Sequence, residues 1–241
     1  MLKTEITSEK SSIKMDILDR GYVELLEVFG DELTVVNAAR VSYGSQKQKL
    51  DDRDIKLISY LKTHKHFSPF RHIFFRFIIK APEVVMRQMM KHVVGIEATS
   101  DSQNQLHGFN ELSGRYKPIE DFYMPEIWRK QSPSSKQASD GVLDESDNQK
   151  AVKIFNETND IIQKCYTDLL NLGVAKEQAR MILPLNMYTS VMWTMSFQAL
   201  ANFIELRDEP TAQYEIQLYA KAMKSMMQEK CPILSKLWFE N

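Results

Sequence analysis

The order of apolar and polar positions predicts strands near the N-terminus and helices in the rest of the chain. Short alternating segments over 14–17 and 22–28 predict two strands joined by a turn. The segment 72–80 is rich in Phe and Ile on both of its faces, which is typical of a strand in the centre of a sheet. From residue 151 onward the apolar spacing predicts helices over 151–172, 175–183, 186–207, 211–230 and a short stretch after Pro232.

Capping residues predict three shorter helices. Asp31 can cap a helix that runs toward Arg40, and a second helix starts at Asp51 or Asp52. That second helix must end near the Ser68-Pro69 pair, because the residue before proline disfavours the helical conformation. Pro82 suits the first position of a third helix, which we expect to run through about residue 92.

Strands early and helices late predict an α+β fold. We expect one domain over residues 1–241, in which a mixed sheet of few strands packs against several helices. Two polar segments, at about 98–108 and 131–150, are interpreted as surface loops of this domain.

Composition narrows the class of protein. The 241 residues carry 31 Lys+Arg and 32 Asp+Glu, a net charge of −1, which gives no overall electrostatic reason to bind nucleic acid. The longest apolar region, 187–204, is broken by polar residues, and the N-terminus lacks the apolar core of a secretory signal. Cys165 and Cys231 are solitary, without zinc-ligand spacing. We therefore expect a cytoplasmic protein with no metal and no nucleic-acid or membrane partner.

The helix predicted from Pro82 carries the first candidate site. Gln88, Lys91 and His92 stand at i, i+3 and i+4, so a continuous helix places them on one face. A solvated polar stripe is the alternative interpretation. The opposite side carries apolar residues that we expect in the core: Val85, Met86, Met89 and Met90.

The second candidate is the segment 109–116, Phe-Asn-Glu-Leu-Ser-Gly-Arg-Tyr. Ser113, Gly114 and Arg115 together offer a hydroxyl, backbone N–H groups and a guanidinium, a combination that suits a phosphate or a nucleotide. An ordinary turn is the alternative, because short glycine motifs often match by chance.

The predicted helix 186–207 carries the third candidate. Its surface is apolar almost all round, yet polar residues recur at every fourth position, and such a stripe must meet partners, a cavity or solvent. Arg207 ends this helix, and Arg180 precedes it closely enough to reach the same space. The stripe consists of Ser190, Thr194, Gln198 and Asn202.

The fourth candidate is the histidine-rich segment 64–72. His64 and His66 can ligate a metal, but no carboxylate or cysteine cluster accompanies them. A helix C-terminus that favours cationic side chains, or a turn that lines a cofactor, are the remaining interpretations.

Taken together, these segments resemble the flavin-dependent thymidylate synthases. The family signature reads Arg-His-Arg, a spacer, and then Ser-x-Asn-Glu-x-Ser-x-Arg-Tyr, which is similar to the 109–116 segment preceded by Lys91-His92. Further similar stretches lie in the same order along most of the chain, at 15–21, 38–42, 66–70, 179–186 and 202–207.

Several positions depart from that signature. Lys91-His92-Val93 replaces Arg-His-Arg, Gly108 replaces the first Ser, and the spacer is longer. Lys keeps one positive charge but lacks the bidentate geometry of Arg. Ser196 and Gln198 stand where the family has Asn and Arg, a variant that resembles forms from viruses of bacteria, for which the host cytoplasm is the expected location.

The resemblance implies a mixed α/β fold, a homotetramer with active sites between subunits, and FAD bound beside dUMP. NADPH reduces the flavin, methylenetetrahydrofolate supplies the one-carbon unit, and dUMP becomes dTMP. The absence of a cysteine arranged beside a base in sequence is consistent with this route, since the other class of thymidylate synthase uses a Cys nucleophile.

The resemblance also implies roles for individual residues. Arg207 is the expected catalytic residue, favouring ionisation at N3 of the uracil. The expected dUMP-binding residues are Gln88, Lys91, Glu111, Leu112, Ser113, Gly114, Arg115 and Arg180. The expected FAD-binding residues are His66, Ser68, Lys91, His92, Val93, Glu111, Ser196, Gln198 and Asn202. Two other functions stay open: hydroxymethylation of a pyrimidine nucleotide, and nucleotide binding without catalysis.

Overall fold

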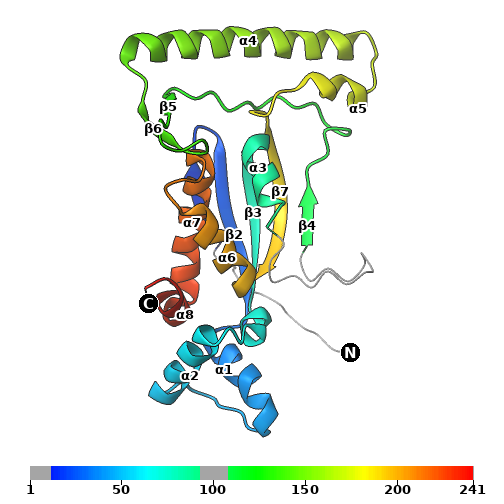
Figure 1. Ribbon diagram of the computed structural model, residues 1–241. Coiled ribbons are helices and arrows are strands. Elements are labelled where there is room, and N and C mark those ends of the chain that lie inside the picture. The colour runs from blue at the N-terminus through cyan, green and yellow to red at the C-terminus, as the bar shows by residue number, and fades with distance from the viewer. Residues whose placement is uncertain (1–11, 93–107, 241) are drawn as a thin grey trace, which may run out of the picture.

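A computed structural model describes residues 12–92 and 108–240 of the protein (Figure 1). Val93 and nearly all of the expected loop at 98–108 therefore lie outside the described residues. The strands are β1 (Ile13–Ile17), β2 (Gly21–Phe29), β3 (Phe74–Pro82), β4 (Gly108–Glu111), β5 (Arg129–Gln131), β6 (Ser139–Val142) and β7 (Tyr188–Ser196). The α-helices are α1 (Glu32–Arg40), α2 (Asp52–Thr63), α3 (Glu83–Met89), α4 (Glu145–Asn171), α5 (Lys176–Ala179), α6 (Phe197–Arg207), α7 (Tyr214–Lys230) and α8 (Pro232–Phe239). Short 3-10 helices are η1 (Val41–Tyr43), η2 (Ser68–His72) and η3 (Arg180–Ile182).

A five-stranded sheet in the order β1-β2-β3-β7-β4 forms the centre of the described chain. The α+β class is confirmed, and β3 is the central strand, as its apolar composition predicted. The expectation of a mixed sheet is wrong in detail, because each pairing among these five strands is antiparallel.

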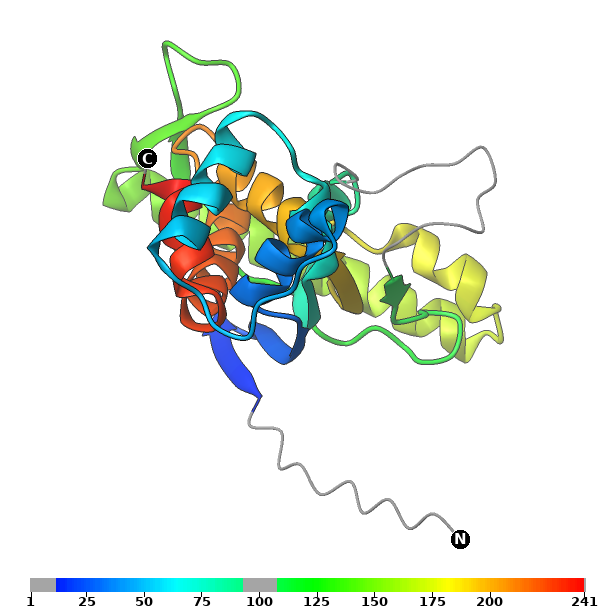
Figure 2. The same ribbon diagram turned by 90° about the horizontal axis from the view of Figure 1, so that it is seen from below.

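One face of the sheet packs against α3, α6 and α7 (Figures 1 and 2). Side chains on that face, such as Phe77 and Trp193, are buried, whereas Arg76 and Met192 on the opposite face are exposed. A sheet covered on one side explains this alternation.

The predicted helix over 186–207 is wrong in its first half, which is the strand β7. β-branched and aromatic side chains, including Val191 and Trp193, favour the pleated conformation, and β7 pairs with β3 along its whole length. The helix α6 begins only after Ser196, whose Oγ accepts a hydrogen bond from the Ala199 backbone at 3.2 Å. The polar stripe from residue 190 to 202 is therefore divided between a strand and a helix.

The short helices near the N-terminus follow the predicted caps. Asp31 forms a capping box with Thr34 at the start of α1, and Asp51 caps α2. The helix α2 ends at Thr63, earlier than the expected Ser68-Pro69 boundary, and the Ser68-Pro69 pair instead opens η2.

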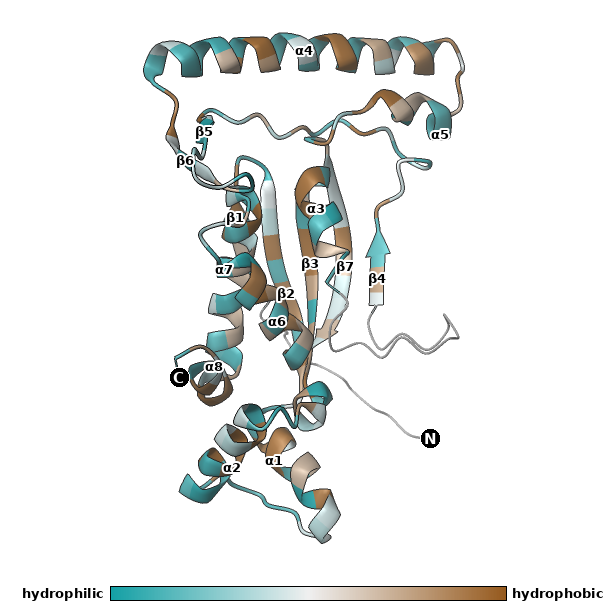
Figure 3. Cartoon of the chain, in the orientation of Figure 1, coloured by the Kyte–Doolittle hydropathy of each residue, from teal (hydrophilic) through white to brown (hydrophobic). Residues whose placement is uncertain are grey.

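The expected surface loop at 131–150 is partly ordered structure. A small β5–β6 hairpin occupies its start, and α4 begins at Glu145 rather than near 151. The helix α4 lies across one end of the molecule, and apolar residues recur at intervals along it (Figure 3). Among these, Ile154 and Ile161 are exposed. Of the helices in the described ranges, none has the length and apolar character needed to cross a bilayer.

Candidate functional site

The C-terminal end of α3 separates residues that the sequence placed on one helix face. The helix ends at Met89, so Lys91 and His92 follow in a turn, with Lys91 exposed and His92 buried. The predicted shared polar face is therefore wrong. Of the four apolar residues expected in the core here, three are buried, but Met90 is 49% exposed.

His92 contacts Arg207 at the end of α6. The Nε of Arg207 donates a hydrogen bond to Nε2 of His92 over 2.8 Å, and the His92 ring meets the edge of Phe203. Burial, together with the positive charge of Arg207, lowers the pKa of His92 to about 4. The imidazole is thus neutral at physiological pH, with its proton on Nδ1 because Nε2 accepts.

Gln88, which is also a predicted site residue, contacts the start of α7. Its Nε2 donates to Oε1 of Gln213 at 2.8 Å and to the carbonyl of Val84 at 3.1 Å. Gln213 in turn donates from Nε2 to the carboxylate of Glu215 at 2.8 Å. These bonds join α3 to α7, and α3 also packs against β7.

β4 and the turn after it hold the segment 111–115. Glu111 lies on β4 beside β7, where its carboxylate accepts a hydrogen bond from the buried Thr189 hydroxyl at 2.7 Å. Burial raises the pKa of Glu83, and the negative charge of nearby Glu111 raises it further. In the turn, the Ser113 hydroxyl accepts a hydrogen bond from the Arg115 backbone at 3.3 Å.

Gly114 is buried directly beside Arg180. A Cβ atom at position 114 would lie 3.0 Å from Cδ1 of Ile119 and 3.4 Å from Cδ of Arg180. The turn after β4 therefore approaches η3 closely, which brings together two positions that the sequence proposed for the same ligand. Leu112 is half-exposed and donates its backbone N–H to Ser190 of β7 at 2.8 Å.

A second group of predicted residues lies between η2 and α6. Arg71 donates from Nε to the buried Oε1 of Gln198 at 2.7 Å. Asn202, one turn further along α6, is half-buried, and Ser196 caps the helix. Ser68 is exposed at the first position of η2, which packs against α6.

Among the described residues, the His66 side chain forms no hydrogen bond with this group. It is exposed, and its ring centroid lies 6.2 Å from that of Tyr60. His64 stacks on the same tyrosine at 3.9 Å. Nor do the described residues contain a group of three or more His, Cys, Asp or Glu side chains that could hold a metal ion.

Three contact residues of these groups were missed from sequence. Gln213 is 125 positions from Gln88, and Arg71 is 127 positions from Gln198. Thr189 lies in a segment whose pattern predicts a helix and is 78 positions from Glu111. No local pattern could have found these pairs, although Arg71 directly follows the Pro-Phe pair at 69–70 that carried part of the resemblance.

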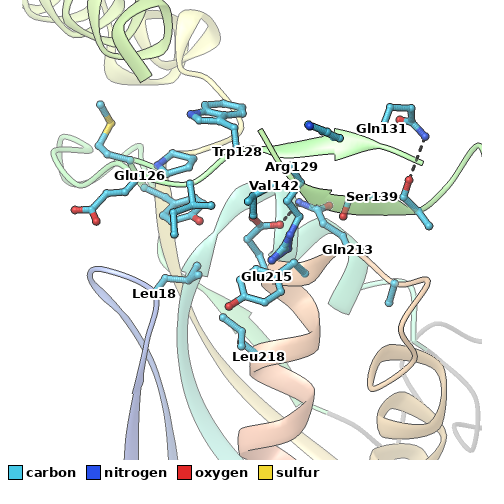
Figure 4. Close-up of a pocket in the computed structure, with 18 of the residues that line it drawn as sticks. Leu18, Glu126, Trp128, Arg129, Gln131, Ser139, Val142, Gln213, Glu215 and Leu218 are labelled. Carbon is cyan, nitrogen blue, oxygen red and sulfur yellow. Dashed lines mark hydrogen bonds between the residues drawn. The ribbon is translucent and has the colours of Figure 1, made fainter. Parts of the chain in front are cut away.

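A cavity of about 860 Å³ lies at the start of α7 (Figure 4). Its walls are the β1–β2 turn, the segment 123–131, the β5–β6 hairpin and α7. None of the residues nominated from sequence lines it, but Gln213 and Glu215 do.

Comparison with known proteins identifies the family. The family model described as thymidylate synthase complementing protein matches residues 24–233. A flavin-dependent thymidylate synthase of Kosmotoga olearia is 40% identical over 222 residues, covering 92% of this chain and 91% of that protein. One of Thermosipho africanus is 41% identical over 217 residues, covering 90% of each.

Solved structures agree with this assignment. The UMP/dUMP methylase PolB of Streptomyces cacaoi, bound with 5-Br dUMP, superposes with a TM-score of 0.79 at 27% identity, covering 94% of this chain and 97% of that one. Its complex with 5-Br UMP gives a TM-score of 0.77. The class is the thymidylate synthases, which are methyltransferases. Within it, the chain belongs to the flavin-dependent thymidylate synthase family, as the resemblance predicted.

Proposed function

We propose that the protein converts dUMP to dTMP, with methylenetetrahydrofolate as one-carbon donor, FAD as bound hydride carrier and NADPH as reductant. Family membership supports the overall reaction. The observation that carries the proposal for this chain is the contact between His92 and Arg207, because it holds a guanidinium at the end of α6 beside the turn that follows α3, where Lys91 and His92 lie.

In this proposal Arg207 performs electrostatic catalysis. Its Nε is engaged by His92, which leaves the terminal amino groups to face the substrate. A fixed guanidinium stabilises the negative charge of a uracil deprotonated at N3 and so raises electron density at C5. Because His92 is neutral, it does not compete for that negative charge.

The nucleotide site in this proposal combines α3 with the turn after β4. Arg115 and Arg180 are exposed cations suited to the phosphate, and Ser113 and Gly114 hold the turn that carries Arg115. The remaining proposed contacts are Gln88, Lys91, Glu111 and Leu112.

The residues between η2 and α6 fit a flavin dinucleotide by the chemistry of their donors. The polar groups of α6 in this set are Gln198, which accepts from Arg71, Asn202 one turn later, and Arg207 at the helix end, which donates to His92; Lys91 and Ser68 supply further donors. Cationic, amide and hydroxyl groups of this kind suit a pyrophosphate and a polar ring edge. His66, Ser196 and Glu111 complete the proposed set among described residues, and Val93 belongs to it outside them.

When bound, the flavin supplies the hydride that brings the transferred carbon to the oxidation level of a methyl group. The protein's own residues orient the two ligands. Glu111 can do this for both, since its carboxylate is fixed by Thr189 at the β4–β7 edge.

We also propose a homotetramer with sites shared between subunits, and a cytoplasmic location. Two apolar side chains of α4, Ile154 and Ile161, are exposed to solvent, and exposed apolar surface of this kind supports association. Native mass spectrometry would report a mass four times that of the chain.

A single reconstitution tests the proposed function. Purified protein is incubated with FAD, NADPH, methylenetetrahydrofolate and dUMP, and the product is identified by mass. We expect dTMP. A product heavier than dTMP by one oxygen atom identifies hydroxymethylation instead, and dUMP binding without NADPH oxidation identifies a non-catalytic homologue. UMP is assayed in parallel, because the PolB relative is a UMP/dUMP methylase.

A further inference from the structure

The side-chain amide of Gln88 has a defined orientation. Its Nε2 hydrogens are both used, one by the Val84 carbonyl and one by Oε1 of Gln213. Within 12–92 and 108–240 no side chain or backbone group donates to Oε1 of Gln88, so this atom is the group left for a ligand, and an amide oxygen only accepts hydrogen bonds.

The orientation of Gln213 is fixed in the same way by Glu215. A carboxylate oxygen accepts hydrogen bonds and cannot donate, so Nε2 of Gln213 must face Glu215 and its Oε1 must face Gln88. Reversal of either amide would place oxygen against oxygen. The three side chains thus form a one-directional relay that begins at an acidic group in the first turn of α7 and ends at α3.

We propose that Gln213 is a positioning residue for the nucleotide site, which turns the Gln88 amide so that its oxygen accepts a hydrogen bond from the substrate. The inference rests on the proposed function, in which Gln88 contacts dUMP. The chemistry it requires of the substrate is an N–H or O–H donor. In dUMP these are the 3′-hydroxyl of the sugar and, before the ionisation that Arg207 favours, the N3–H of the uracil.

The position of the relay suits this role. Gln213 is the residue before the first turn of α7, and Figure 4 shows the dashed bond that joins it to Glu215 at the helix start. The backbone on both sides of the Gln88–Gln213 bond belongs to elements that pack against each other, α3 and α7. A site built on packed helices holds its polar groups more accurately than one built on loops.

The test is Gln213→Leu in the FAD-loaded protein, with Gln217→Leu as the matched control. Gln217 lies one turn further along α7, and its side-chain amide donates to the backbone carbonyls of Ala212 and Pro210 in the preceding loop. We expect Gln213→Leu to raise the dUMP dissociation constant, measured by calorimetry, about tenfold, as loss of one oriented hydrogen bond does. The control should stay within about twofold at a comparable melting temperature.

An exchange variant separates positioning from packing. Gln213→Glu combined with Glu215→Gln keeps an acceptor at position 213 for Gln88 and supplies the donor from position 215. This double variant should recover dUMP affinity to within about threefold of the wild type, whereas Gln213→Glu alone should not.

The outcomes distinguish the inference from the function on which it rests. Unchanged dUMP affinity in Gln213→Leu, with clear loss in Gln88→Leu, overturns the relay and leaves the proposed function standing. Failure of the wild type to bind dUMP overturns the proposed function itself. With 2′,3′-dideoxyuridine monophosphate, a penalty of Gln213→Leu that disappears assigns the donor to the sugar hydroxyl, and one that persists assigns it to the uracil N–H; either result supports the relay.

Discussion

The Nε of Arg207 and the Nε2 of His92 lie 2.8 Å apart, and the imidazole is the acceptor. This one bond fixes two properties at once: the tautomer of a buried histidine and the direction of an arginine at the end of α6. A protonated His92 has no lone pair on Nε2, so protonation would remove the bond and place two positive charges together.

The pH dependence of stability tests the neutral state of His92. Its pKa is lowered from 6.5 to about 4, so between these pH values the unfolded chain binds a proton that the folded chain does not. Stability from neutral His92 is therefore complete above pH 6.5 and is lost as the pH falls toward 4, by up to about 3 kcal/mol. Urea unfolding of His92→Gln between pH 7 and 4 should show a shallower loss than wild type.

Arg207→Ala separates catalysis from binding. If the guanidinium stabilises charge that develops in the reaction, kcat should fall on the order of 100-fold, with a change in dUMP affinity of only a few-fold. Steady-state kinetics and calorimetry together measure both quantities. A loss of affinity that accounts for the whole fall in kcat/KM would contradict the catalytic role.

Arg115→Ala should mainly weaken dUMP binding and leave kcat almost unchanged. Arg115 is exposed in the turn after β4, where a guanidinium suits the phosphate of the nucleotide. We expect dUMP affinity to fall about tenfold, with kcat at saturating dUMP within about twofold of wild type. Lys117→Ala removes a neighbouring exposed charge and serves as the control. An equal loss of dUMP affinity in this control would indicate that Arg115 acts through the general positive potential of the surface rather than through a specific contact.

The fold was largely predictable, because caps and spacing are local. Asp31 and Asp51 cap the helices that they were expected to cap, and the Phe- and Ile-rich segment is the central strand. The failure at β7 has a physical cause: a segment apolar on most sides has no clear period, and pairing with β3 decided its conformation. Its β-branched and aromatic residues were the neglected signal.

The sequence predicted candidate residues for the site, but it did not predict the contacts among them. Which side chain meets which depends on tertiary contacts across more than a hundred positions, as for Gln88 with Gln213 and Arg71 with Gln198. The end of α3 at Met89 was also missed, and it turns His92 inward to Arg207 instead of leaving it on a polar face.

Thr189→Val tests whether Glu111 is held for both ligands. The substitution keeps the shape of the side chain but removes the hydroxyl that donates to Glu111 at 2.7 Å. Loss of this bond should lower stability by about 1 kcal/mol and weaken both FAD and dUMP binding a few-fold, as measured by fluorescence titration and calorimetry. Thr194→Val changes the same residue type on β7 at a half-buried position and should leave both affinities near wild type.

Gly114→Ala tests the close approach of the turn after β4 to Arg180. The added methyl would lie 3.0 Å from Cδ1 of Ile119 and 3.4 Å from Cδ of Arg180, so one of these side chains must move. We expect dUMP affinity to fall about fivefold, because the phosphate would lose an aligned guanidinium. Ile119→Val removes the Cδ1 atom, so the double variant relieves the tighter of the two contacts. Recovery of affinity in the double variant would show that Ile119 transmits the strain, whereas wild-type affinity in Gly114→Ala alone would contradict the need for glycine at this position.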